Sequence, residues 1–183
     1  MNLYKMLYFI GLMPPLPLRA KIQEMKMDFK ENYDSSHALN SPPHITLIPP
    51  FRITDEPTAK ELLQNFANEH SSFEVELKDF SHFGKRVIFI DVVESQFLNK
   101  LHQGLKKVMS NHSLVFEYAS QPKPYHPHLT LAFKDLSNEN FRRAWAIYNT
   151  QSYNASFETK ELVLFKHYQQ KWHIDGKFEF GKG

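Results

Sequence analysis

The feature of this sequence that most constrains its fold is a tetrapeptide that occurs twice, each time directly after a proline. The first copy is His44-Ile45-Thr46-Leu47 and the second is His128-Leu129-Thr130-Leu131. Because side chains alternate between the two faces of a β-strand, the histidine and threonine of each copy should share one face, with the apolar residues on the other. Each copy therefore predicts a strand with one polar face and one buried face.

Nearly half of the chain separates the two copies, and similar elements flank each of them. Each half is predicted to contain an apolar strand, an amphipathic helix, the His-x-Thr strand, a second helix and a further strand. We interpret this pattern as an internal duplication, roughly residues 1–81 and 82–183, within one domain that spans residues 1–183. The predicted fold class is α+β, with two pseudo-symmetric lobes of antiparallel sheet flanked by helices. The two His-x-Thr strands are expected to face each other across a central cleft.

Hydrophobic periodicity and capping residues locate the individual elements. Apolar residues at steps of three and four predict a helix over residues 18–33. Asp55, Ser95 and Ser137 are expected to cap the three later helices. Pro49-Pro50 is expected to end the first His-x-Thr strand. The remaining strands are predicted over residues 4–12, 73–77, 87–93, 157–165 and 172–180.

Charge and cysteine content exclude several classes of protein. The formal net charge is +2, so no large basic field is present to hold long nucleic acid, although a local phosphate site remains compatible with it. The absence of cysteine excludes disulfides, Cys-ligated zinc and a thiol nucleophile, and favours a cytoplasmic location. The apolar run at residues 6–13 is too short to span a bilayer. We expect a monomer with no membrane association and no obligatory protein partner.

Two histidines that face each other suit the opening of a phosphodiester. Histidine has an ordinary pKa of about 6.5, so it serves as general base or general acid near neutral pH. Our working assignment takes His44 as the acid and His128 as the base, although the symmetry of the motifs does not distinguish these roles. Thr46 and Thr130 are expected to donate hydrogen bonds to the non-bridging oxygens. Strand propensity alone would also explain either threonine.

Five further residues are candidates for substrate binding. Tyr125 and Phe51 flank the motifs and could stack on a base or sugar, although a core position suits Phe51 better in a chain with 16 phenylalanines. Arg86 and Lys134 could supply positive charge near the phosphate, with a solvated surface role as the alternative. His167 follows an apolar strand and could reach the rim of the cleft.

The paired motifs resemble those of the 2H phosphoesterase superfamily, which includes the 2′-5′ RNA ligase-like proteins and cyclic phosphodiesterases. The resemblance runs from the strand at residues 7–12, through Pro43-His44-Ile45-Thr46-Leu47 and Pro127-His128-Leu129-Thr130-Leu131, to the last strand. It implies a bilobal α+β fold, no metal cofactor and hydrolysis of 2′,3′-cyclic or related phosphodiesters. The implied partner is a cyclic nucleotide or an RNA with a cyclic phosphate end. The substrate differs among members and stays open.

Three alternatives remain beside this hypothesis. In a metal hydrolase, His126 and His128 could ligate a metal together with His44, although neither motif contains the carboxylate that such sites usually add. A non-catalytic module could bind a nucleotide or an RNA end in the same cleft. A 2′-5′ RNA ligase could run related chemistry in reverse by using the energy of a cyclic phosphate. We expect no metal ligands and no cofactor.

Overall fold

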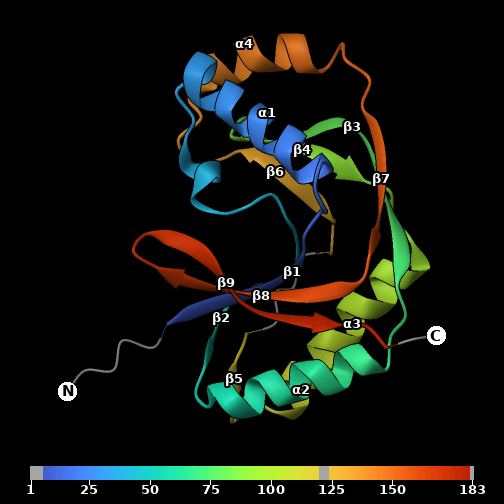
Figure 1. Cartoon of the computed structure of the whole chain (residues 1–183). Coiled ribbons are helices and arrows are strands. Elements are labelled where there is room, and N and C mark those ends of the chain that lie inside the picture. The colour runs from blue at the N-terminus through green and yellow to red at the C-terminus, as the bar shows by residue number, and fades with distance from the viewer. Residues whose placement is uncertain (1–5, 120–123, 182–183) are drawn as a thin grey trace.

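One antiparallel sheet of nine strands organises the computed structural model, which describes residues 6–119 and 124–181 (Figure 1). The strand order is β7-β3-β4-β6-β2-β1-β8-β9, and the short β5 pairs with β2 beside this path. The strands are β1 Leu7–Leu12, β2 Ile45–Ile53, β3 Phe73–Phe83, β4 Val87–Val92, β5 Phe116–Glu117, β6 His128–Ala132, β7 Asn154–Thr159, β8 Glu161–Tyr168 and β9 Lys171–Glu179. The helices are α1 Leu18–Tyr33, α2 Glu56–Asn68, α3 Gln96–Asn111 and α4 Asn138–Tyr148, with a 3₁₀ turn, η1, at His37–Asn40.

The main path of the sheet divides into two groups of four strands that meet where β6 pairs with β2. The first lobe contains β1, β2, β8 and β9 together with α2 and α3, and the second contains β3, β4, β6 and β7 together with α1 and α4 (Figure 1). In the first lobe α2 contacts β9 and α3 contacts β2, and in the second α1 contacts β6 and α4. The predicted bilobal α+β architecture is therefore confirmed.

The two lobes are not the two halves of the sequence. Helix α1 follows β1 in the chain, yet it packs against β6 in the other lobe. Strand β3 likewise leaves α2 of the first lobe and pairs with β4 in the second. Each lobe thus contains segments from both residues 1–81 and residues 82–183, so the chain crosses between lobes repeatedly. The internal duplication itself stays a prediction.

Strand β2 continues through the two prolines that were expected to end it. Tyr8 pairs with Phe51 and Ile10 pairs with Ile48, so β2 contains one more residue than β1 between these two pairs. This β-bulge includes Pro49-Pro50, where a missing backbone N–H is tolerated because the regular ladder is interrupted. The prediction that the strand ends at these prolines was wrong for this reason.

The strand predicted over residues 157–165 is in fact two strands of different lobes. β7 pairs with β3, whereas β8 pairs with β1 and β9, and only Lys160 separates them. The burial pattern marks the change, because β7 alternates between exposed and buried residues while β8 is buried on both faces over 162–165. No glycine or proline marks this junction, which explains why the sequence did not predict it.

The predicted helix boundaries are largely confirmed. α1 spans the predicted residues 18–33, and the side chains of Asp55, Ser95 and Ser137 each accept a backbone N–H at the start of the next helix. Residues 4 and 5 of the first predicted strand lie outside the described part of the chain, and β1 begins at Leu7. Within the described residues, no helix is both long and apolar enough to cross a membrane.

Candidate active site

The pairing of β2 with β6 brings the two His-x-Thr motifs together. Ile45 lies opposite Leu129, and both side chains are fully buried on the helix-covered face of the sheet. In this antiparallel register the next positions place His44 opposite Thr130 and Thr46 opposite His128. Because side chains alternate along each strand, all four polar side chains lie on the opposite face. The structure thus brings the four predicted catalytic residues to one place.

Aromatic rings and one backbone carbonyl hold the ring of His44. The ring centroid lies 4.5 Å from that of Phe9 on β1 and 5.5 Å from that of Phe165 on β8. Its Nδ1 lies 2.7 Å from the carbonyl oxygen of Pro42. A carbonyl only accepts hydrogen bonds, so Nδ1 carries the hydrogen and the neutral ring keeps its lone pair on Nε2.

His128 has the same kind of surroundings in the other lobe. Its ring centroid lies 4.9 Å from that of Phe83 and 5.0 Å from that of Phe89. Its Nδ1 donates to the carbonyl of His126 at 2.7 Å, again two residues before the motif histidine. Each histidine therefore presents Nε2 as the nitrogen that is available for proton transfer. The two sites repeat one local design across the line where the lobes meet.

The neutral forms of both histidines are favoured, but unequally. The pKa of His44 is lowered to about 3, mainly by burial and in addition by the charges of Lys26 and His128, while the hydrogen bond to Pro42 opposes the shift. Burial also lowers the pKa of His128, and the charge of His126 adds to this. The hydrogen bond to the His126 carbonyl and the carboxylate of Asp91 act in the opposite direction. Protonation is thus more accessible at His128.

Lys26 is a buried basic residue that sequence analysis missed. Its side chain is 2% exposed, and Nζ donates to the carbonyl oxygens of Ala38 at 2.9 Å and Ser41 at 3.0 Å. These bonds hold the segment that leads into His44. Burial lowers the pKa of Lys26 to about 7. The signal was present in the sequence, because Lys26 follows Ile22 by four positions and therefore lies on the apolar face of α1.

Tyr125 and His102 form hydrogen bonds with the backbone of the first motif. Their rings stack at 3.9 Å, and His102 Nδ1 donates to the carbonyl of Leu47 at 2.9 Å. Leu47 is the extra residue of a second irregularity in β2, between the pairs Ile10–Ile48 and Gly11–Thr46, so its carbonyl is free of the regular ladder. The Tyr125 hydroxyl also contacts the carbonyl of Thr46 at 3.4 Å. Tyr125 thus lies at the site, where it supports the strand.

Asp135 connects the approach to the first motif with the end of β6. Its carboxylate accepts hydrogen bonds from the hydroxyl of Ser35 at 2.8 Å and from the backbone N–H groups of Ser36 and His37 at 2.8 and 2.9 Å. This contact joins residues about one hundred positions apart. It therefore fixes the two motif-bearing segments relative to each other.

The other predicted binding residues are found in different surroundings. Phe51 is 3% exposed and packs near Tyr8 and Phe116, so it belongs to the core and has no free face to offer a ligand. Arg86 is exposed in the turn of the β3–β4 hairpin, which also bears Phe83. Lys134 is exposed two residues after β6, with Nζ 5.5 Å from the Phe133 ring.

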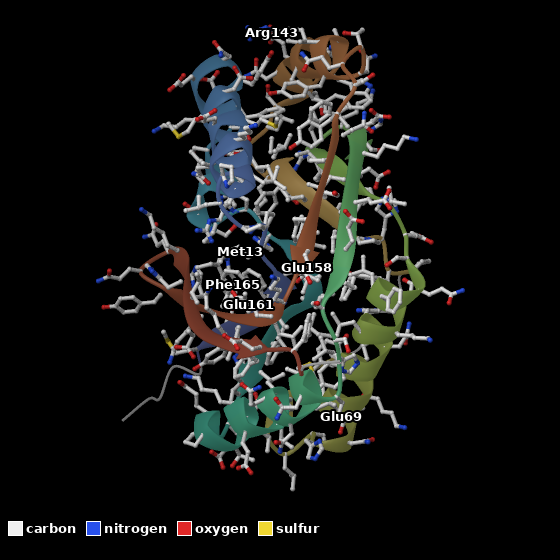
Figure 2. The ribbon with its side chains drawn as sticks, turned by 45° about the vertical axis from the view of Figure 1, so that its right-hand side comes forward. Met13, Glu69, Arg143, Glu158, Glu161 and Phe165 are labelled. Atoms are coloured by element: carbon white, nitrogen blue, oxygen red, sulfur yellow. The ribbon has the colours of Figure 1, made fainter. Side chains whose placement is uncertain are left out.

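His167 contacts an aromatic residue that sequence analysis treated only as the start of a strand. The His167 ring lies 4.9 Å from Trp172, and Trp172 in turn contacts Phe9 at 4.7 Å. Phe9, Val163 and Phe165 form a small apolar cluster with Met13 and Trp172 packed against it. Figure 2 shows Met13 and Phe165 near each other at about mid-height of the molecule. This cluster is one wall beside His44.

His126 pairs with Asp91 and does not form a metal-binding pair with His128. His126 Nε2 lies 3.1 Å from Asp91 Oδ1, while His128 Nδ1 is bonded to the carbonyl of His126. Within residues 6–119 and 124–181, no group of three His, Asp or Glu side chains is arranged to hold a metal ion. The His-Pro-His sequence thus places its two rings in different interactions.

Comparison with protein families shows a match that covers most of the chain. The model of the 2′-5′ RNA ligase superfamily matches residues 14–171. A Geobacillus kaustophilus protein named "putative phosphoesterase" is 31% identical over 141 residues, covering 74% of this chain and 73% of that protein. A protein of the same name from Geobacillus sp. strain WCH70 is 30% identical over 159 residues, covering 84% and 82%.

Solved structures share the fold at much lower sequence identity. The protein TT0787 of Thermus thermophilus has a TM-score of 0.68 at 17% identity, covering 97% of this chain and all of that one. LigT of E. coli complexed with 3′-AMP has a TM-score of 0.66 at 16% identity, covering 97% and 99%. LigT is also known in complexes with NADP+ and with ATP.

Proposed function

Because the chain belongs to the 2′-5′ RNA ligase superfamily, we propose that it is a metal-independent phosphodiesterase that opens 2′,3′-cyclic phosphates of nucleotides or RNA ends. The observation that carries this proposal is the matched pair of histidines on one sheet face. Each has Nδ1 bonded to a carbonyl at 2.7 Å and Nε2 left for proton transfer. Two such groups beside one phosphorus suit in-line attack by water.

The reaction needs one base and one acid. The base removes a proton from water as its oxygen bonds to phosphorus, and the acid donates a proton to the ribose oxygen as its bond to phosphorus breaks. The net change is the addition of one water and the formation of a phosphomonoester. After the reaction the base is protonated and the acid is deprotonated, and proton exchange with solvent restores both histidines.

The surroundings of the two histidines favour the reverse of our working assignment. His44 lies against Phe9 and Phe165, with Lys26 close enough to lower its pKa, so it is held neutral as a base. His128 has the carboxylate of Asp91 nearby, which favours its protonated form. We therefore assign His44 as the base and His128 as the acid for hydrolysis. Thr46 and Thr130 would donate to the non-bridging oxygens, whose charge grows in the transition state.

Two other functions are compatible with the same pair of motifs. Ligation to a 2′-5′ bond opens the same cyclic phosphate with a ribose 5′-hydroxyl in place of water: its oxygen bonds to phosphorus as the bond to the 3′ oxygen breaks, and the family name supports it as the second candidate. A binding module would hold the nucleotide without turnover. The LigT complex with 3′-AMP supports a nucleotide ligand for the fold, at 16% identity to this chain.

The test is hydrolysis in the presence of a chelator. The substrates are the four nucleoside 2′,3′-cyclic monophosphates and a short RNA that ends in a cyclic phosphate. We expect turnover that falls by about 10²–10⁴-fold in His44→Ala and in His128→Ala, the range for a lost general acid or base. His112→Ala, which removes a histidine at the C-terminal end of α3, is the matched control and should retain activity.

Each outcome bears on the proposal. Activity that requires an added metal would refute the metal-independent mechanism. Tight binding of a cyclic phosphate without product would favour the binding module. A loss of only two-fold in either histidine variant would remove that residue from the chemistry.

A further inference from the structure

A cavity lies beside the candidate active site. It has a volume of about 420 Å³ and lies among the N-terminal part of α1, the segment that leads into β2, and the β8–β9 hairpin. Its lining includes Pro42, whose carbonyl binds His44 Nδ1, so it begins within two residues of the catalytic histidine. We call this cavity the flanking pocket.

An aromatic contact chain joins the flanking pocket to His44. Trp172 lines the pocket and meets the Phe9 ring at 4.7 Å in an edge-on contact. Phe9 in turn lies 4.5 Å from the His44 ring. Two successive ring contacts therefore connect Trp172 of the flanking pocket with His44, and Pro42 and Pro43 of the pocket lining directly precede His44 in the chain.

Within the described part of the chain, every charged side chain that lines the flanking pocket is basic. Arg19 and Lys171 line it, together with His173, and no Asp or Glu does. In the described part of the chain, Arg19 Nη1 donates a hydrogen bond to the sulfur of Met13 at 3.2 Å. A thioether sulfur is a weak acceptor. A guanidinium with five donors and a weak partner is suited to bind a phosphate.

Neutral groups complete a surface for a nucleotide. Trp172 offers an aromatic face on which a base can stack, an interaction that tolerates every base. Gln23 and Asn40 supply amide donors and acceptors that suit the polar edge of a base. A charged group for the phosphate, an aromatic ring for the base and amides for its edge are thus present in one cavity.

We propose that the flanking pocket binds the nucleotide that precedes the reacting end of an RNA, with Arg19 and Lys171 on its phosphate and Trp172 on its base. The inference rests on the proposed function, since it takes the cyclic phosphate to lie between His44 and His128. The substrate is then an RNA end of at least two nucleotides, and a cyclic mononucleotide fills only part of the site.

The experiment compares two substrates that differ by one nucleotide. They are adenosine 2′,3′-cyclic phosphate and the dinucleotide ApA with a 2′,3′-cyclic phosphate end. We expect the full-length protein to prefer the dinucleotide by about 10-fold or more in kcat/KM, the value of one charged hydrogen bond or one stacked base. Arg19→Gln combined with Lys171→Gln should reduce this preference by about 10-fold.

Arg142→Gln combined with Lys30→Gln is the matched control, because both residues are exposed and neither lines the flanking pocket. This variant also removes two positive charges, but outside the pocket, and should leave the preference for the dinucleotide unchanged. Equal kcat/KM for the two substrates, or a preference that survives the double substitution, would overturn the inference while leaving the proposed phosphodiesterase intact.

A binding measurement separates the two proposals. Dissociation constants are measured for 3′-AMP and for ApA with a 3′-phosphate, neither of which needs turnover. If neither cyclic substrate is hydrolysed, the proposed function fails, and tighter binding of the dinucleotide that depends on Arg19 and Lys171 still supports the pocket. Equal binding of the two ligands would refute the pocket whether or not the protein is an enzyme.

Discussion

The buried Lys26 gives the folded protein a stability that depends on pH, and Lys26→Met should abolish this dependence. Burial lowers the pKa of Lys26 from 10.5 to about 7 in the folded state. Between these values the unfolded chain binds a proton that the folded chain does not. The free energy of unfolding of the wild-type protein should therefore rise with pH by about 1.4 kcal/mol per pH unit from this group. Below pH 7 both states are protonated and the contribution is constant.

The magnitude follows from the width of this window. A pKa change from 10.5 to about 7 corresponds to about 5 kcal/mol across the whole range. Methionine has a similar length and no proton, so it removes this term. It also leaves the carbonyls of Ala38 and Ser41 without their donor, at a cost of roughly 1–3 kcal/mol each at every pH. The variant should therefore be clearly less stable than wild type near pH 10 and about equally stable near pH 7.

Urea denaturation of both proteins at several pH values between 7 and 10 measures this difference. Other groups titrate in the same range, but they are shared by both proteins and cancel in the comparison. Lys30→Met is the matched control, because Lys30 is exposed on the same helix. Parallel stability curves for wild type and Lys26→Met would refute the assigned pKa and the burial argument with it.

Four further predictions concern the site and its support. With His44 as base and His128 as acid, kcat/KM should follow a bell-shaped pH profile whose optimum lies below pH 6.5, since the pKa of each histidine is lowered; a flat profile from pH 5 to 9 would contradict this. Gly11→Ala should lower both stability and activity, because a Cβ there would lie 2.7 Å from the carbonyl oxygen of Ile45; unchanged thermal melting would argue against this close approach. Phe51→Ala should lower the free energy of unfolding by about 3–5 kcal/mol in urea denaturation and change KM little, as expected for a core ring. A raised KM with unchanged stability would instead show that Phe51 contacts the substrate. Tyr125→Phe should retain most activity, because the ring stacked on His102 is kept, and a large loss of kcat would show that the hydroxyl acts in the reaction.

The repeated motif predicted the central part of the fold well. Alternation along His44–Leu47 and His128–Leu131 correctly indicated which side chains are buried, since Ile45, Leu47, Leu129 and Leu131 are all at most 1% exposed. Helix boundaries also followed from local signals, because a cap such as Asp55 acts within its own first turn. These features depend on neighbours in the chain, and such neighbours are visible in the sequence.

Other features depend on residues that are distant in the chain. The break at Lys160 separates strands of two lobes because β7 and β8 find different partners, which no local signal at residue 160 specifies. Phe51 and Trp172 are both aromatic residues in strands, yet one is in the core and the other contacts the wall beside His44. Their surroundings are set by packing between distant segments, and the sequence does not show which of these segments come together.

The sequence by itself thus determined the pair of motif histidines and the strand faces that they occupy, because a strand's alternation is a property of its own backbone. Only the tertiary structure decided how these groups differ. Lys26 and Phe165 reach His44 from α1 and β8, whereas Asp91 reaches His128 from β4, and these unequal neighbours shift two identical side chains by different amounts. Electrostatic energy depends on distance and burial, and both are properties of the folded molecule.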